Sequence, residues 1–201
     1  MNSYPQRVAD SLLPLSVAGT VPEAAEEWRV TGKVVDHEFA EQTCQLCGQE
    51  HVRYHFEIEN AFTRKTLWTG SQCILRFEVA VFEDGERVRG QDAKKALNRL
   101  IEAEQHACCL AALDELARIE HDERFGDIRA RYARDKRLTP KQAAWVFSRL
   151  AHHRIRHTTA LFAITLKKAK YRQDLRGMPE AQRRLVQEAL TSEQRTAVQS
   201  R

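Results

Sequence analysis

The chain has 201 residues, of which 42% are hydrophobic and 30% are charged, a composition that predicts one substantial folded domain or two small ones. No stretch approaches the roughly 20 uninterrupted apolar residues of a membrane helix, and the first residues lack the basic start and apolar run of a secretory signal. We therefore expect a cytoplasmic protein without membrane contact, whose five cysteines bind a metal or carry out redox chemistry rather than form structural disulfides.

The charge is unevenly distributed along the chain, although the formal net charge is only +4. Residues 122–201 contain 19 Lys and Arg against 8 Asp and Glu, a net charge of +11, whereas residues 1–121 carry a net charge of −7. Such asymmetry indicates either a polyanionic partner for the C-terminal part or a solvated helical surface, and charge alone leaves both open.

The first 27 residues predict a linker or a loosely packed arm, because Pro14 and Pro22 interrupt them. After this arm the pattern changes to alternating apolar and polar residues, which is typical of half-buried strands. We expect a small antiparallel module over residues 28–90, with strands at residues 28–35, 53–59 and 65–69, the last two forming a hairpin.

From residue 91 onward the pattern becomes helical. Apolar residues recur at spacings of three, four and seven up to about residue 121, which predicts one long helix with Cys108 on its buried face. Thr139 and Pro140 supply an N-cap and a first helical position. The segment 157–170 suits a buried strand as well as a helix, and its helical neighbours favour a helix. The other expected helices are at residues 124–137, 139–150 and 178–190, followed by a frayed tail.

Three cysteines form the most specific pattern in the sequence. A turn of the form Cys-x-x-Cys-Gly directs the sulfurs of Cys44 and Cys47 at one spot, and Cys73 lies in the first turn of a short helix expected at residues 72–80. Structural zinc takes four tetrahedral ligands, so one more is needed. We expect His55, on the first strand of the hairpin, with His51 as the alternative.

The alternatives to a metal site are a set of buried free cysteines and a Cys73 nucleophile served by His55. The sequence offers no recognisable orienting carboxylate or oxyanion hole for such a nucleophile. Glycine-rich phosphate loops, Ser-His-Asp constellations and paired catalytic carboxylates are also missing from it. We therefore do not expect an enzyme.

The segments CQLCG, RYHFEIEN and TGSQCILRF stand in an order that resembles a treble-clef zinc finger. Over residues 42–77 they are also similar to a small zinc module of uncharacterised phage and plasmid proteins. The resemblance implies a zinc-stabilised platform in a mobile-element setting, where nucleic-acid transactions and interference with host defence are common. A treble clef usually takes its fourth ligand one helical turn after the third cysteine, where this chain has Arg76.

We expect an α+β fold in which the zinc-binding module is followed by a mainly helical, basic region, residues 91–201. Within it, residues 124–176 contain only three acidic residues among many Lys and Arg. Tyr132 and Tyr171 lie among these charges, where an aromatic ring can stack a base, whereas Trp145 and Phe147 are expected in the core. The expected nucleic-acid contacts are Arg129, Arg131, Tyr132, Arg134, Lys136, Arg137, Arg154, Arg156, Lys167, Lys168, Lys170 and Arg172.

The histidines at 152, 153 and 157 suggest a second metal site, but with no acidic residue beside them we favour phosphate contacts or plain surface. The sequence thus predicts a nucleic-acid-binding protein with structural Zn²⁺, and leaves open whether the partner is DNA or RNA, single strand or duplex. The alternative from another class is a protein-interaction adaptor or inhibitor, or a subunit of a larger ribonucleoprotein complex.

Overall fold

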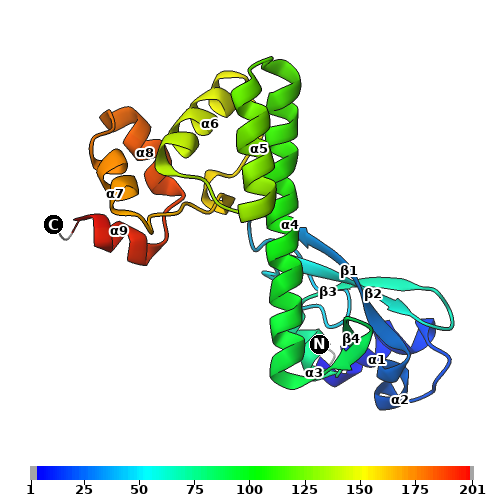
Figure 1. Cartoon of the computed structure of the whole chain (residues 1–201). Helices are drawn as coiled ribbons and strands as arrows, with labels where there is room; N and C mark the ends of the chain where they lie inside the picture. The colour runs from blue at the N-terminus through cyan, green and yellow to red at the C-terminus, as the bar shows by residue number, and fades with distance from the viewer. Residues whose placement is uncertain (1–3, 200–201) are drawn as a thin grey trace. The chain divides into compact units, whose positions relative to one another are not determined.

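The structure, a computed structural model of the chain, describes residues 4–199 (Figure 1). It combines α-helices with small antiparallel sheets, as expected of the mixed fold. The chain divides into two compact units, Met1–Glu104 and Gln105–Arg201, and the division falls inside a single long helix. Within residues 4–199, no helix combines the length and apolar character that crossing a membrane requires.

The first unit is built on a three-stranded antiparallel sheet of order β1-β2-β3, with a separate β4-β5 hairpin that the sequence did not predict. Its elements are α1 (Tyr4–Leu12), the 3-10 helix η1 (Leu13–Leu15), α2 (Val21–Glu26), β1 (Trp28–Asp36), β2 (Tyr54–Asn60), β3 (Thr66–Thr69), α3 (Ser71–Arg76), β4 (Val81–Glu83), β5 (Glu86–Val88) and the first part of α4 (Gly90–Ile119).

The sheet and the flanking helices bury one apolar core. Trp28 on β1 and Phe56 and Ile58 on β2 are fully buried, and Leu97 of α4 joins them at 1% exposure. The β1-β2 register shifts between Val30 and Val34, so β1 bends while both ends stay paired with β2.

Residues 4–26 are packed rather than loose, which corrects the expectation of an arm. Pro14 and Pro22 are the second residues of η1 and α2, in the first turn of each helix, where proline is tolerated instead of breaking the helix. Val8 and Leu12 of α1 are 0% and 1% exposed and belong to the core of the unit. Their spacing of four residues is the helical signal that the prolines obscured.

The buried carboxylate of Glu27 holds the segment before β1 in place. It accepts hydrogen bonds from the backbone amides of Val17 and Ala18 at 2.9 and 2.7 Å, and from Asn60 Nδ2 at 2.7 Å. The Asn60 amide is the main cause of a pKa for Glu27 below its usual range, and the two backbone donors add to it.

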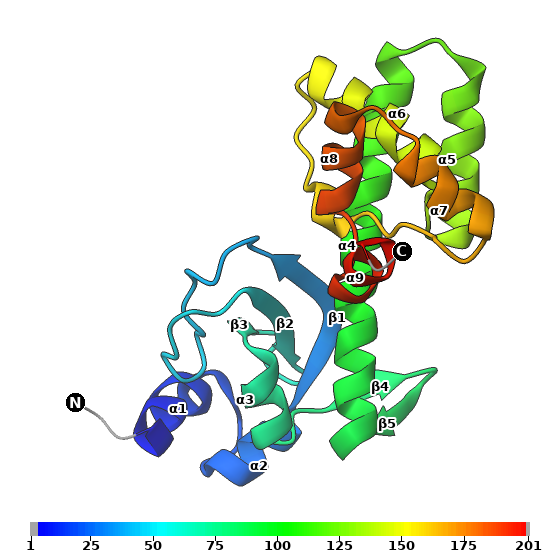
Figure 2. The same ribbon diagram turned by 90° about the vertical axis from the view of Figure 1, so that its left-hand side faces the viewer.

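The second unit is helical (Figure 2). Its helices enclose a separate core that includes Leu116, Phe147, Phe162 and Val186. Its elements are the last part of α4, α5 (Glu123–Asp135), α6 (Pro140–His152), the 3-10 helix η2 (Thr159–Leu161), α7 (Ala169–Arg176), α8 (Glu180–Glu188) and α9 (Ser192–Gln199). Thr139 caps α6 as predicted, in a capping box with Gln142.

Three expectations for this unit are wrong. The segment 157–170 is not one helix: between η2 and α7 it has no helix, and Leu138 bridges Ile164 in parallel, with backbone bonds to Ala163 and Thr165 at 2.9 Å. The tail forms α9, whose start is capped by Thr191. On α4 it is Cys109, not Cys108, that is buried.

Candidate metal centre and basic surface

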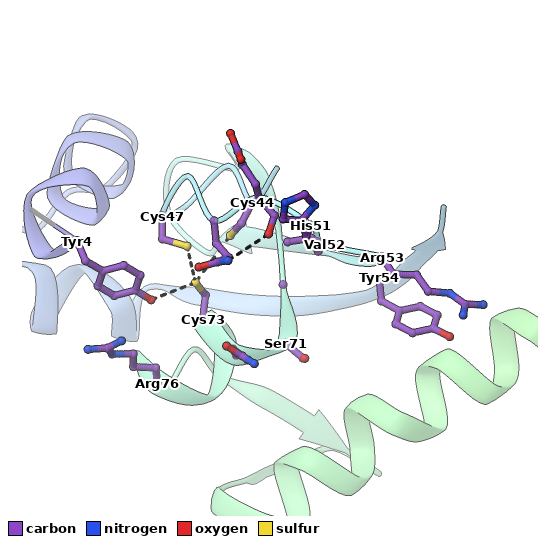
Figure 3. Close-up of a pocket in the computed structure, with 14 residues that line it drawn as sticks. Tyr4, Cys44, Cys47, His51, Val52, Arg53, Tyr54, Ser71, Cys73 and Arg76 are labelled. Carbon is purple, nitrogen blue, oxygen red and sulfur yellow. Dashed lines mark hydrogen bonds between the residues drawn. The ribbon is translucent and has the colours of Figure 1, made fainter. Parts of the chain in front are cut away.

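Three cysteines, two from a turn and one from helix α3, meet at one point in the first unit (Figure 3). Cys44, Cys47 and Cys73 have their sulfurs within 4.8 Å of one another, and all three residues are buried. The Cys73 sulfur lies 3.2 Å from that of Cys47 and 3.7 Å from that of Cys44. These separations are far longer than a disulfide bond of about 2.05 Å.

The backbone around Cys44 and Cys47 forms a tight turn that directs both sulfurs inward. The amide of Gly48 donates to the Cys44 carbonyl at 2.8 Å, and Gly48 has φ of +71°, a conformation that favours glycine. Cys73 comes from the first turn of α3, immediately after β3 and Gly70. The hairpin and this helix therefore place the third sulfur opposite the turn.

Polar groups surround the sulfurs. The Thr69 hydroxyl lies 3.1 Å from the Cys44 sulfur, and the Tyr4 hydroxyl lies 3.5 Å from the Cys73 sulfur. The hydrogen bond with Cys73, followed by that with Thr69, lowers the pKa of the Cys44 thiol well below its ordinary range, despite burial. Burial and the neighbouring sulfur raise the pKa of Tyr4, so its phenol stays protonated. The cluster thus favours a thiolate, the form that binds metals, at Cys44, whereas the hydrogen bond with Cys44 and burial raise the pKa of Cys73.

The cysteine geometry could hold a metal ion. If a metal sits about 2.3 Å from each sulfur in tetrahedral geometry, the sulfurs lie about 3.8 Å apart. The observed 3.2 and 3.7 Å are close to this value, so a small adjustment would suffice. The three sulfurs also line a cavity of about 390 Å³, together with Tyr4 and His51.

His55 does not join this group, contrary to the sequence prediction. Among residues 4–199, its ring is not within 4.8 Å of all three sulfurs. Instead its Nδ1 lies 3.2 Å from His37 Nε2, because β2 pairs with β1 and brings the two rings edge to face. Burial lowers the pKa of His55, so its ring is neutral. Sequence spacing could not reveal this long-range pairing with His37.

His51 is also outside the group of ligand atoms. Its ring Nδ1 lies 3.2 Å from the Ala40 carbonyl, and its backbone has φ of +63°. It does line the cavity on the side of the Cys44 turn (Figure 3). The part of the chain that the structure describes therefore brings three of the four expected ligands together.

The residues predicted to contact nucleic acid all lie in the second unit, and they differ in how exposed they are. Arg129 and Arg172 are half-buried, and Tyr132 is buried at 2% exposure. The others are exposed: Arg131, Arg134, Lys136, Arg137, Arg154, Arg156, Lys167, Lys168 and Lys170.

Tyr132 cannot stack a base, which corrects the prediction. Its ring packs against Phe162 at a centroid distance of 5.5 Å and against His106 at 5.2 Å. The signal for a core position was present in the sequence: with Phe125 and Ile128 it forms a stripe at spacings of three, four and seven on α5.

Two of the expected arginines are already occupied by carboxylates. Arg129 Nε lies 2.7 Å from Asp114 Oδ1, and Arg134 Nε lies 2.7 Å from Asp135 Oδ1. Similarly, Arg172 donates to the Leu166 carbonyl at 2.7 Å. These three cations are partly neutralised or held by the protein itself.

The expected core position of Trp145 is also revised, because its ring is only partly buried, whereas Phe147 is fully buried. Trp145 stacks on Phe125 with 4.0 Å between centroids, and the guanidinium of Arg124 lies over it at 4.8 Å. It borders a hollow of about 340 Å³ between α5 and α6, which Arg124, Arg131 and Lys141 also line.

The histidines of the second unit do not form a metal site in the described part of the chain. His153 Nε2 lies 2.6 Å from Glu120 Oε1, which also pairs with Arg149, and His157 Nδ1 lies 2.9 Å from the Ile155 carbonyl. Both histidines thus make contacts within the fold.

Comparison of the chain with protein-family models, with curated proteins and with solved structures gives no match.

Proposed function

We propose that the chain is a nucleic-acid-binding protein whose first unit is stabilised by a structural zinc ion. Three converging cysteine sulfurs are soft ligands, and in such a set zinc is favoured over magnesium or calcium, which take oxygen ligands. Cys44, Cys47 and Cys73 would hold the ion, which supplies a cross-link between the cysteine turn and α3. Since structural zinc contributes folding free energy, the ion would stabilise the turn and the hairpin together.

Nucleic-acid binding is supported by cations that have no acidic partner. Within residues 4–199, seven of the exposed predicted contacts form no ion pair: Arg131, Lys136, Arg137, Arg154, Lys167, Lys168 and Lys170. The second unit as a whole has a net charge of +9, and the first unit has −5. Unpaired surface cations attract phosphates and release the counterions condensed on a nucleic acid.

The hollow beside Trp145 is the observation that carries this proposal. It combines a partly exposed indole with three cations, of which Arg131 is outside the ion pairs of the described residues, whereas Arg124 and Lys141 pair with Asp122 and Asp174; Asp127 also lines it. Aromatic rings that stack bases and neighbouring cations that meet phosphates are the two components of single-strand binding sites. Arg124 is exposed and lies over the indole, so it can move aside or stack with the base itself.

Fluorescence anisotropy of a labelled single-stranded oligonucleotide, titrated with the full chain, tests the proposal. We expect Trp145→Ala to weaken binding by about 1–3 kcal/mol, the typical value of one stacked base. Trp145→Phe keeps an aromatic ring on Phe125 and should weaken binding less. Trp68→Ala, a change to a half-buried tryptophan of the first unit, is the matched control. Equal binding by all four proteins would reject the Trp145 site.

A second candidate function is protein interaction through the first unit, as an adaptor, an inhibitor or a ribonucleoprotein subunit. The observation that favours it is the exposure of three phenylalanines, Phe39 at 66%, Phe62 at 71% and Phe82 at 51%. Exposed aromatic side chains are enriched in interfaces. If the isolated chain binds no oligonucleotide at low salt, this candidate replaces nucleic-acid binding.

A further inference from the structure

We propose that helix α1 is the closing element of the metal centre, so that metal loading and the docking of α1 stabilise each other. The inference rests on the proposed metal binding by Cys44, Cys47 and Cys73, and adds to it two residues outside the cysteine motif, Tyr4 and Arg7. They act as positioning residues: each holds a cysteine rather than the metal.

Tyr4 contacts the cluster through its hydroxyl, which lies 3.5 Å from the Cys73 sulfur (Figure 3). A phenol O–H can donate to a thiolate, and a metal-bound thiolate keeps lone pairs that accept such a bond. Groups that hydrogen-bond to metal ligands orient the ligands and tune the bound metal. Tyr4 therefore supplies the Cys73 sulfur with a donor from a segment about 70 residues away in sequence.

Arg7 holds the other side of the cluster. Its Nε donates to the Cys47 carbonyl at 2.7 Å, a charge-assisted hydrogen bond to the cysteine turn. Its side chain also lies against Gly48, where an added Cβ would be 3.5 Å from Arg7 Cδ and Nε. One turn of α1 thus contacts both Cys73 and Cys47.

Arg76 of α3 fixes Tyr4 in this position. Its guanidinium carbon lies 4.4 Å from the centre of the Tyr4 ring, and Phe77 stacks on the same ring at 6.0 Å. Arg76 is the last residue of the helix that carries Cys73, and Phe77 is its C-cap, so α1 and the end of α3 enclose the cluster together. Farther along α1, Val8 and Leu12 anchor the helix in the core independently of the metal.

Metal binding and the docking of α1 are coupled because both involve Cys47 and Cys73. The metal would bind the two sulfurs, while Tyr4 contacts the Cys73 sulfur and Arg7 the Cys47 carbonyl. A metal that fixes the three sulfurs prepares the Cys73 sulfur and the Cys47 carbonyl to receive Tyr4 and Arg7. By thermodynamic reciprocity, α1 must then raise the affinity of the metal by the same factor. Loss of a group that supports metal ligands typically lowers metal affinity about 10- to 100-fold.

Competition between the full chain and a chromophoric zinc chelator tests this coupling. We expect Tyr4→Phe and Arg7→Ala each to weaken zinc binding about 10- to 100-fold. Tyr4→Phe retains the ring under Arg76, so it isolates the hydroxyl. The matched control is Gln6→Ala, which changes an exposed residue of α1 whose side chain bonds only to Asp10 among the described contacts. It should bind zinc like the unchanged chain.

Two further measurements separate a positioning role from a general loss of stability. In the cobalt-substituted protein, the sulfur-to-cobalt charge-transfer band should move to lower energy in Tyr4→Phe, because the Cys73 thiolate loses a donor. Hydrogen exchange of the helix-bonded amides of Val8 to Leu12 in α1 should be faster in the zinc-free chain than in the zinc-loaded chain, while exchange in α6 should stay the same.

The outcomes are distinguishable from those of the metal proposal itself. If the unchanged chain binds no stoichiometric zinc, the proposed metal centre fails and the inference fails with it. If the unchanged chain binds zinc, but neither variant alters its affinity and α1 exchanges at the same rate with and without zinc, the inference alone is overturned.

Discussion

Removing three unpaired cations from the second unit should flatten the salt dependence of nucleic-acid binding. The variant replaces Arg131, Arg137 and Lys167 by alanine, all exposed and all outside the ion pairs of the described residues. Each phosphate neutralised by a protein cation adds about 0.7 to the slope of log affinity against log salt for a single strand, and about 0.9 for a duplex. If each side chain meets one phosphate, the slope should fall by about 2.1 or 2.7, respectively.

The choice of these three cations follows from the ion pairs. Arg129 and Arg134 lie 2.7 Å from the carboxylates of Asp114 and Asp135, so removing either one exposes a negative charge as well as deleting a positive one. Its effect on binding would then mix two causes. Lys136 is left unchanged because it is the left-handed C-cap residue of α5, so the end of that helix is not altered.

Anisotropy titrations at several NaCl concentrations give the slope. The control removes three exposed cations from the first unit, Lys65, Arg89 and Lys94, for the same loss of charge. The control should lower affinity slightly through net charge while leaving the slope nearly unchanged. An equal fall of the slope in both triple variants, or no fall in the Arg131, Arg137 and Lys167 variant, would show that binding does not use this surface.

Three other outcomes follow from buried groups. Cys73→Ser should reduce zinc from one ion per chain to substoichiometric amounts by elemental analysis, whereas Cys108→Ser, at an exposed cysteine, should leave it unchanged. Tyr132→Ala should lower the free energy of unfolding by about 3–5 kcal/mol in urea titrations, as for other large aromatic truncations, and a loss below about 1 kcal/mol would contradict its core position. The folded pKa of Glu27 is lowered, so its contribution to stability is complete above its ordinary pKa of 4.5 and is lost as the pH falls through the folded value. Glu27→Gln should therefore lose less stability than the unchanged chain between neutral and acid pH, and equal losses would count against the Glu27 contacts.

Local patterns predicted the cysteine cluster and the start of α6, because each is decided by residues close in sequence. The Cys-x-x-Cys-Gly turn fixes two sulfurs within four residues, and the capping box of Thr139 and Gln142 also spans four residues. Predicting the position of the third sulfur, that of Cys73, required only that the hairpin bring the chain back to the cysteine turn. Short sequence segments decide the geometry of these features, so they could be predicted without the rest of the fold.

The errors concern contacts between distant segments. His55 alternates with its neighbours on β2, but which side of the sheet faces the cysteines depends on the pairing with β1, which places His37 beside it. Tyr132 was assigned by the polarity of its immediate neighbours. On a helix, burial depends on residues three and four positions away, and these placed Tyr132 inside.

Arg76 connects the departure from the treble-clef pattern with the packing of α1. It occupies the position one helical turn after Cys73 where a treble clef would carry its fourth ligand, and arginine cannot replace a thiolate there. Instead, its guanidinium covers Tyr4, whose hydroxyl reaches the Cys73 sulfur. The side of the cluster that a fourth cysteine would close is thus approached by α1. In this chain, α1 would supply part of the stabilisation of the metal centre that a fourth cysteine supplies in a treble clef. The sequence pattern did not predict this helix.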